Sequence, residues 1–354
     1  MKNTLMLIIS LNAAVFAEEI RGAGRFVDGI AAIKLDKYYY IDKKGKVQLP
    51  QAYDFAYEFH EGLAEVTKGG VKGYIHRSGQ FFGNEAYVMT SAFKNGYGKV
   101  MVKAVDKGAV FTPGYLIIDK TGKVILDSKA DRVNDFSEGV FNVKNHDVCS
   151  SLTISGKSAF SLPCTGISMF YNGRAILETA DGFALIDKKG QKIKTLPFNK
   201  VRLYAKEGKA IVITGEKCGY FDINTLETIQ PQFEKCSDFS SGRAPVIQNN
   251  KWGVIDEMGK FVVKPKYIDT YYNFTEGLLA VQSAENRLYG YIDTSGKLVI
   301  PHKYKIATGF GDGLAGVAVA GEKDENSHSC AFSSECKFIY IDKFGKTVID
   351  GVSH

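Results

Sequence analysis

The chain has 354 residues, of which 45% are hydrophobic and 24% charged, a composition typical of a folded globular protein and not of a disordered, collagen-like or coiled-coil chain. The 45 Lys and Arg residues against 39 Asp and Glu give a formal net charge of +6, and no block of basic residues stands out, so a dedicated nucleic-acid-binding protein is disfavoured. The length fits two or three average domains or one long repeat array.

The N-terminal segment, residues 1–17, has the pattern of a secretory signal peptide. Lys2 supplies a short basic region, residues 5–16 are mostly apolar, and Val15-Phe16-Ala17 offers small residues at the two positions that signal peptidase reads. An uncleaved anchor is the alternative, but the apolar stretch is shorter than the about 20 residues that a membrane span needs. We therefore predict cleavage of residues 1–17, no membrane span in the mature chain, and an exported protein, either periplasmic or secreted.

From residue 18 to about residue 350 the chain is predicted to form one domain of repeats. One recurring pattern reads Phe-x-Glu-Gly-x-Ala-x-Val, as in residues 59–66, and a second reads Tyr-Ile-Asp-x-x-Gly-Lys, as in residues 40–46. A Pro-x-Tyr or Pro-x-Phe element follows most copies of the second pattern, as at residues 265–267. The glycine of the first pattern occurs nine times, as Gly29, Gly62, Gly96, Gly139, Gly173, Gly208, Gly242, Gly277 and Gly313.

These patterns predict strands and turns. Asp-x-x-Gly between two apolar runs indicates a hairpin in which Asp caps the turn and Gly takes the left-handed position. The two residues before this Asp are mostly aliphatic or aromatic, so both faces of their strand are expected to be buried. No long helical pattern occurs, and we predict an all-β protein of three to four short strands per repeat.

One such repeat cannot bury its own faces, so neighbouring repeats must stack. A closed β-propeller with one repeat per blade fits, and an open superhelical β-repeat array fits as well. Closure is supported because the last repeat lacks a Pro-x-Tyr strand and residues 20–26 align with the missing piece. Against closure, nine units exceed the usual number of about four to eight blades.

Insertions fall at a single position of the repeat. The spacing from the first-pattern glycine to the following Asp position is nearly constant in six units, and it is longer in units three, eight and nine, as from Gly96 to Asp119 and from Gly313 to Asp342. Because insertions in repeat proteins map to one face, which is often the binding face, these loops are the candidate binding site. In unit three the candidate is Phe111, within residues 103–115; in unit nine, within residues 321–337, the candidates are Asp324, Asn326, His328 and Phe332.

All six cysteines lie after the signal peptide, which favours disulfides over free thiols. Many connectivities are open, and proximity in the sequence suggests the pairs Cys149–Cys164, Cys218–Cys236 and Cys330–Cys336, the last of which would close the loop of unit nine. A metal site is disfavoured, because no Cys-x-x-Cys and no Cys/His pair at ligand spacing occurs.

The segment Lys251-Trp252-Gly253-Val254-Ile255-Asp256, followed by Gly259-Lys260, resembles the WG-repeat family, also called KWG repeats. The resemblance covers about residues 20–350 with nine degenerate copies, and it implies a β-rich repeat module, often in secreted or envelope proteins, without catalytic residues. The Trp position is occupied in the other units by Tyr38, Lys72, Tyr115, Cys149, Phe183, Cys218, Tyr289 and Phe338. We therefore interpret the first two cysteine pairs as replacements for lost Trp packing, with Cys236 on the next strand of the same unit.

No motif for catalysis stands out. The repeated Asp, and Glu61, Glu138 and Glu276 of the first pattern, are explained by turns, the histidines are scattered, and there is no nucleophile elbow or P-loop. We therefore expect no enzyme, no cofactor and no metal. The predicted function is that of a monomeric, non-catalytic binding protein that presents its inserted loops to a protein or glycan partner. The alternatives are a hydrolase acting on envelope glycans or peptides, which would need two acidic residues converging from different blades, and a structural spacer.

Overall fold

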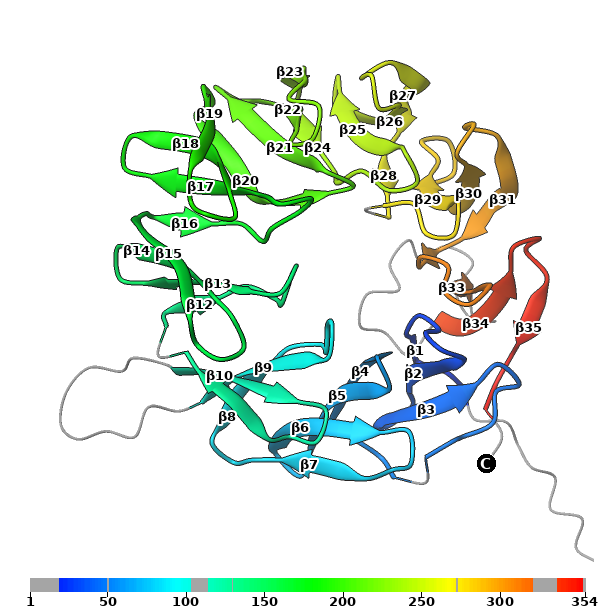
Figure 1. Ribbon diagram of the computed structural model, residues 1–354. Helices are drawn as coiled ribbons and strands as arrows, with labels where there is room; N and C mark the ends of the chain where they lie inside the picture. Colours follow the sequence, from blue (N-terminus) through cyan, green and yellow to red (C-terminus); the bar gives the residue numbers. More distant parts are fainter. Residues whose placement is uncertain are drawn as a thin grey trace, which may run out of the picture.

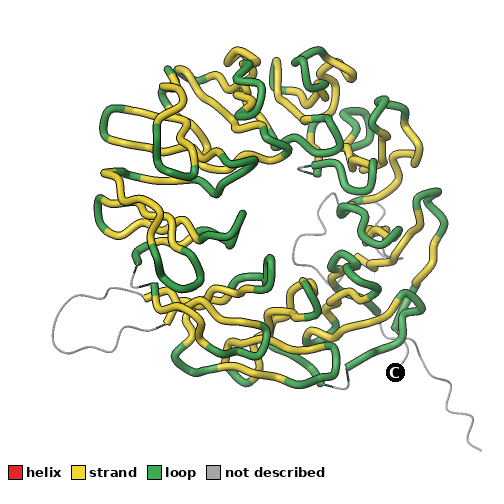
Figure 2. The backbone as a smooth tube through the Cα atoms, viewed as in Figure 1, coloured by secondary structure: helices red, strands yellow, loops and turns green. Residues whose placement is uncertain are grey.

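A computed structural model describes residues 19–49, 51–102, 114–128, 130–271, 273–320 and 336–352. Within these ranges every regular element is a β-strand, and the strands form nine small antiparallel sheets arranged around a ring (Figures 1 and 2). The protein is thus an all-β, nine-bladed β-propeller, which is the first of the two architectures predicted from the sequence.

Consecutive strands form each blade, three in blade 1 and four in each of the others. The first strand of a blade lies nearest the central opening and the last lies at the rim, as β4 to β7 show (Figure 1). Blades 1 to 3 consist of β1 (Gly22–Ala23), β2 (Ile30–Lys34) and β3 (Tyr38–Asp42); β4 (Phe55–His60), β5 (Leu63–Lys68), β6 (Val71–His76) and β7 (Phe81–Gly83); and β8 (Tyr87–Thr90), β9 (Tyr97–Val102), β10 (Gly114–Asp119) and β11 (Val124–Asp127). Blades 4 to 6 consist of β12 (Arg132–Val133), β13 (Phe141–Asn145), β14 (Val148–Leu152) and β15 (Ser158–Pro163); β16 (Gly166–Ile167), β17 (Arg174–Thr179), β18 (Gly182–Asp187) and β19 (Lys192–Leu196); and β20 (Lys200–Lys206), β21 (Lys209–Thr214), β22 (Lys217–Asp222) and β23 (Thr228–Phe233). Blades 7 to 9 consist of β24 (Lys235–Cys236), β25 (Ala244–Gln248), β26 (Lys251–Ile255) and β27 (Phe261–Tyr267); β28 (Asp269–Thr270), β29 (Leu278–Gln282), β30 (Tyr289–Asp293) and β31 (Leu298–Tyr304); and β32 (Ile306–Ala307), β33 (Leu314–Ala320), β34 (Cys336–Asp342) and β35 (Thr347–Ile349).

The Asp-x-x-Gly segments form the predicted turns between third and fourth strands. Asp42 Oδ1 accepts the N–H groups of Lys44 and Lys46 at 2.8 and 3.0 Å, and Gly45 has a φ of 78°. In blade 6, which lacks the glycine, Leu226 takes the left-handed position with a φ of 66° and donates its N–H to the Asp222 carbonyl. The turn therefore survives the lost glycine at the cost of a strained backbone position.

The Glu-Gly pair of the first pattern forms a two-residue hairpin turn between first and second strands. Both Glu61 and Gly62 have positive φ, 54° and 86°. The Glu61 carboxylate accepts the N–H groups of Asn95 and Gly96 in the next blade at 2.6 and 2.9 Å, and it pairs with Lys120 of that blade at 3.1 Å. The same inter-blade bonds to the next turn are made by Glu138, Glu207 and Glu276. The predicted turn role is confirmed, and the carboxylates also link neighbouring blades.

Neighbouring blades also pack through a repeated Tyr–Phe contact. Tyr40 and Ile41 are both 0% exposed, which confirms that both faces of the third strand are buried. The Tyr40 ring packs edge-on against Phe59 of blade 2 at 4.8 Å between centroids, and its hydroxyl donates to the Tyr57 carbonyl at 2.8 Å. Equivalent ring pairs are Tyr74–Phe93, Tyr220–Phe239 and Tyr291–Phe310.

The N-terminal segment closes the ring onto blade 9. Ile20 bridges Phe338 in the way that Tyr267 pairs with Trp252 in blade 7, so it fills the place of the missing Pro-x-Tyr strand. Tyr340 repeats the inter-blade contact, with its ring 4.9 Å from Phe26 and its hydroxyl 2.7 Å from the Gly24 carbonyl oxygen. Ile20 thus extends the last blade as predicted, whereas Gly22 and Ala23 form the first strand of blade 1, and the nine-bladed ring is closed.

Candidate functional site

The residues predicted to bind a partner fall outside the described part of the chain. These are Phe111, Asp324, Asn326, His328 and Phe332; residues 1–17 of the predicted signal peptide and Cys330 of the predicted Cys330–Cys336 pair also lie outside it. In the sequence, residues 103–113 stand between β9 and β10, and residues 321–335 stand between β33 and β34. The described connections from the second to the third strand of a blade, such as residues 215–216, share one face of the propeller, called here the insertion face.

Two of the three sequence-predicted cysteine pairs are disulfides in the structure, Cys149–Cys164 and Cys218–Cys236. Cys218 lies on β22 of blade 6 and pairs across the sheet with Phe233, as Trp252 pairs with Tyr267. Cys236, however, lies on β24, the first strand of blade 7, so its placement within the same unit was wrong. Cys164 likewise lies in the connection from blade 4 to blade 5. The Cys218–Cys236 disulfide therefore ties blades 6 and 7 together, and the Cys149–Cys164 disulfide ties blade 4 to the start of its connection with blade 5.

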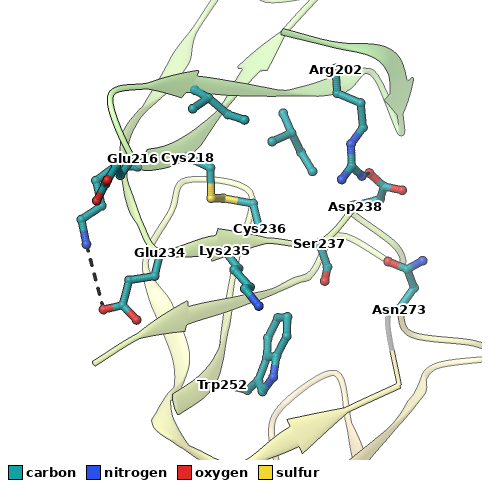
Figure 3. A pocket seen from close by; sticks show the side chains of 13 residues that line it. Arg202, Glu216, Cys218, Glu234, Lys235, Cys236, Ser237, Asp238, Trp252 and Asn273 are labelled. Carbon is teal, nitrogen blue, oxygen red and sulfur yellow. Dashed lines mark hydrogen bonds and ion pairs between the residues drawn. A yellow bond between two sulfur atoms is a disulfide. The ribbon is translucent and has the colours of Figure 1, made fainter. Parts of the chain in front are cut away.

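A cavity of about 780 Å³ surrounds the Cys218–Cys236 disulfide and is called here the Trp252 pocket (Figure 3). Its apolar wall consists of the disulfide, Ile211, Ile213 and the indole of Trp252. The first strand of blade 6 contributes to this wall through an irregularity in its pairing with β21. Val201 pairs with Val212 and Ala205 with Ala210, so the three residues from Arg202 onward stand opposite Ile211 alone.

Charged groups surround this apolar wall in balanced number. Arg202 pairs with Asp238 at 2.9 Å and Lys217 lies 4.0 Å from Glu234 (Figure 3). The full set of charged lining residues is Arg202, Lys217 and Lys235 against Glu216, Glu234 and Asp238. The backbone N–H groups of Asn250 and Asn249 hold the pKa of Glu234 below its ordinary value, so this carboxylate stays charged and fixed in place.

A second site lies along the first strands of blades 1 to 3 and is called here the inner groove. It consists of two pockets of about 440 and 390 Å³ that share Tyr57 and Glu65. Phe55, Tyr57 and Met89 line it and are 56%, 61% and 56% exposed, so three large apolar side chains gather on one exposed surface.

A β-bulge brings two carboxyl groups to one place in this groove. Ala56 pairs with Val66 and Phe59 with Ala64, so Tyr57 and Glu58 on β4 stand opposite Glu65 alone on β5. Bulges of this kind re-aim side chains and often occur beside functional sites. The hydrolase alternative expected carboxyl groups from different blades, whereas this pair comes from neighbouring strands of one blade.

The two carboxyl groups have different surroundings. Glu58 accepts a bond from Arg25 of blade 1 at 2.9 Å, and the His60 Nε2 atom lies 3.9 Å from the same carboxylate oxygen. Burial raises the pKa of the Glu65 carboxyl, against the opposing effects of a hydrogen bond with Thr90 and of the nearby His60. Glu58 is thus ion-paired, while Glu65 is largely buried and has a raised pKa.

Sequence reasoning singled out Trp252 and the cysteines but did not bring them into one pocket, and it did not find the inner groove. In the described part of the chain no group of three or more His, Cys, Asp or Glu residues is placed to hold a metal ion. The same described residues contain no helix that is long and apolar enough to cross a membrane.

The fold defines a closed propeller scaffold with pockets between its blades. A family model described as "WG containing repeat" matches residues 40–71, 117–149, 219–252, 252–285 and 289–322. Each match runs from the third strand of one blade through the first two strands of the next. The chain is a WG-repeat protein, as its sequence resemblance indicated.

Solved structures resemble the chain at low sequence identity, and the first of those named here shares its fold. The crystal structure of a eukaryotic initiation factor matches with a TM-score of 0.63 and 10% identity, over 94% of this chain and 96% of that chain. The dihydro-heme d1 dehydrogenase NirN in complex with DHE matches with a TM-score of 0.46 and 10% identity, over 79% of this chain and 72% of that chain. Hsv2p of Kluyveromyces lactis matches with a TM-score of 0.41 and 14% identity, over 67% of this chain and 91% of that chain. No curated protein sequence matches the chain.

Proposed function

We propose that this protein is an exported, non-catalytic binding protein that holds a protein or glycan partner at its insertion face. One observation carries the proposal: the Trp252 pocket is lined by Glu216, from the connection between β21 and β22, and by Lys217, the first residue of β22, and this connection is the position that bears the insertions in the sequence of blades 3 and 9. The pocket therefore lies beside the position in the repeat at which the sequence of blades 3 and 9 carries its insertions.

The chemistry of the pocket suits recognition. Ligand sites are typically concave and largely apolar, with a few fixed polar groups that orient the ligand. Here a half-buried indole and a disulfide supply the apolar surface, and the Arg202–Asp238 pair and Glu234 supply fixed polar groups. Export is supported by the signal-like residues 1–17 and by disulfides, which form and persist in oxidising compartments.

The test is an affinity capture from envelope and culture fractions with the oxidised mature protein and two variants. Trp252→Ala removes the indole of the pocket, and Met258→Ala, at an 84% exposed turn residue of the same blade, is the matched control. A partner captured by the wild-type protein and Met258→Ala but lost with Trp252→Ala supports the proposal. Capture that does not differ among the three proteins overturns it. A melting temperature for each variant separates loss of binding from loss of folding.

The inner groove favours a second candidate function, a hydrolase that acts on envelope glycans or peptides. Glu58 and Glu65 line the same pocket, the first ion-paired and the second buried with a raised pKa, and a pair of carboxyl groups is what acid–base hydrolysis uses. The reaction adds water across the cleaved bond. Release of reducing ends or free amines from envelope polymer by the wild-type protein, and its loss in Glu65→Gln, would establish it; no release by the wild-type protein would exclude it.

A further inference from the structure

We propose that the inner groove binds a linear, uncharged oligosaccharide whose sugar rings stack on Tyr57 and Phe55. The inference concerns a different site from the Trp252 pocket and does not depend on the partner held there. It requires binding alone, so it stands whether or not the bound chain is cleaved.

The shape of the groove calls for an extended ligand. Its two pockets each exceed the about 300 Å³ at which small-molecule sites begin. They are joined by Tyr57 and Glu65, and their lining runs from Gly22 of blade 1 to Met89 of blade 3. A ligand that fills both pockets must pass Tyr57, which places one unit of a chain on each side of this ring.

The exposed rings form a rigid platform. The bulge at Tyr57 and Glu58 interrupts the alternation of β4, so that both Ala56 and Phe59 enter the core while Phe55 and Tyr57 face the groove. The Phe55 ring is stacked on Tyr38 at 5.8 Å, and the backbone of Tyr57 is held by the Tyr40 hydroxyl. Flat rings with a negative face and little conformational freedom attract the apolar C–H faces of sugars, and covering them removes apolar surface from water.

Charge argues for a neutral ligand. The charged lining residues are Lys34 and Lys72 against Glu58 and Glu65, with no excess of either sign. A polyanion such as nucleic acid needs a basic groove, which is not present here. Hydroxyl groups, which donate and accept, can pair with ammonium and carboxyl groups alike.

The strand edge argues for a sugar over a peptide. β4 is the first strand of its sheet, so its inner edge has no neighbouring strand within blade 2 and an extended peptide would bind by strand addition. The bulge at Tyr57 and Glu58 interrupts the regular spacing of β4, and bulges are a device that prevents such pairing. The groove therefore presents side chains, not a continuous row of backbone groups.

The experiment is a calorimetric titration of the oxidised mature protein with defined probes. The neutral probes are hexasaccharides of β-1,4-glucose, α-1,4-glucose, β-1,4-xylose and β-1,4-N-acetylglucosamine; the comparison probes are a hyaluronan hexasaccharide and a neutral hexapeptide. We expect binding of at least one neutral hexasaccharide, weakened at least tenfold by Tyr57→Ala and by Phe55→Ala. Trp252→Ala is expected to leave this affinity unchanged, which separates the two sites.

Three results would overturn the inference: no binding of any neutral hexasaccharide, binding that Tyr57→Ala leaves intact, or binding of the charged sugar or the peptide alone. Both substituted side chains are more than half exposed, so the variants are expected to fold, and equal melting temperatures check this. Reducing-end release is followed in the same samples. Binding without release supports the inference and excludes the hydrolase for that sugar.

Discussion

Blades 7 and 8 and blade 2 are built from the same repeat, yet their inner strands differ. In blades 7 and 8 the first strands, β24 and β28, have two residues each, although they lie, as β4 does, in segments that match the family model. In blade 2 the first strand, β4, has six residues, a bulge and two exposed aromatic side chains. The repeat thus determines the outer strands and the packing between blades, and it leaves the first strand free to vary.

Blade 6 extends this comparison. Its first strand, β20, has seven residues and its own irregular pairing, and it contributes Arg202 to the Trp252 pocket. Both candidate sites therefore lie where a first strand is long and irregular. Stability and binding are separable in such a molecule. The recurring residues of the repeat stabilise the fold, and the variable inner strands form the candidate binding sites.

The largest effect on the free energy of unfolding is expected where blade 9 contacts the N-terminal segment and closes the ring. Tyr340 is 0% exposed and joins blade 9 to the N-terminal segment through Phe26 and Gly24. Tyr340→Ala removes a buried ring and is expected to lower the free energy of unfolding by about 3–5 kcal/mol. Urea denaturation measures it, with Phe344→Ala, at a 90% exposed position, as the control. A loss under about 1 kcal/mol, the size of a typical surface effect, would mean that the ring is not held closed by this contact.

A smaller effect is expected at the inter-blade disulfide. Cys218→Ser combined with Cys236→Ser removes a cross-link between blades 6 and 7 and should cost about 2–4 kcal/mol. Thermal melting under oxidising conditions measures it, and reduction of the wild-type protein should produce a similar shift. An unchanged melting temperature in the double variant would show that the packing of blades 6 and 7 needs no cross-link. Intact mass should show no free thiol at Cys149, Cys164, Cys218 or Cys236.

A pH-dependent effect of about 1 kcal/mol is expected from the inter-blade carboxylates. Burial alone raises the pKa of Glu61, but the Gly96 N–H and the Lys120 ammonium outweigh it and hold the pKa below the ordinary 4.5. A lowered pKa in the folded state gives stability that is present above the unfolded pKa and lost as pH falls through the folded one. Glu61→Gln should therefore be less stable than the wild-type protein at pH 7, and the difference should shrink below about pH 4.5. A difference that is constant from pH 7 to pH 3 would show that charge plays no part.

The sequence predicted the parts of this molecule that depend on local chemistry. The capping of Asp42 and the strand pairing of Ile20 follow from turn residues and from the repeat pattern. It did not predict that Glu61 bonds to Asn95, 34 residues away, because that contact depends on the angle between two blades. The site residues were missed for a related reason. Alternation in β4 does not reveal a bulge, so nothing in the sequence places Glu65 opposite Tyr57 and Glu58.

The smallest effect on stability is expected at Tyr57, and it completes the comparison within a single strand. Phe59 on β4 is 0% exposed and packs on Tyr40, whereas Tyr57, on the same strand, is 61% exposed. Tyr57→Ala should change the free energy of unfolding by less than about 0.5 kcal/mol, because surface substitutions rarely exceed this. Phe59→Ala should cost about 3–5 kcal/mol by the same urea titration. If Tyr57→Ala were as destabilising as Phe59→Ala, the Tyr57 ring would be part of the core. It would then not be available to stack on a ligand in the inner groove.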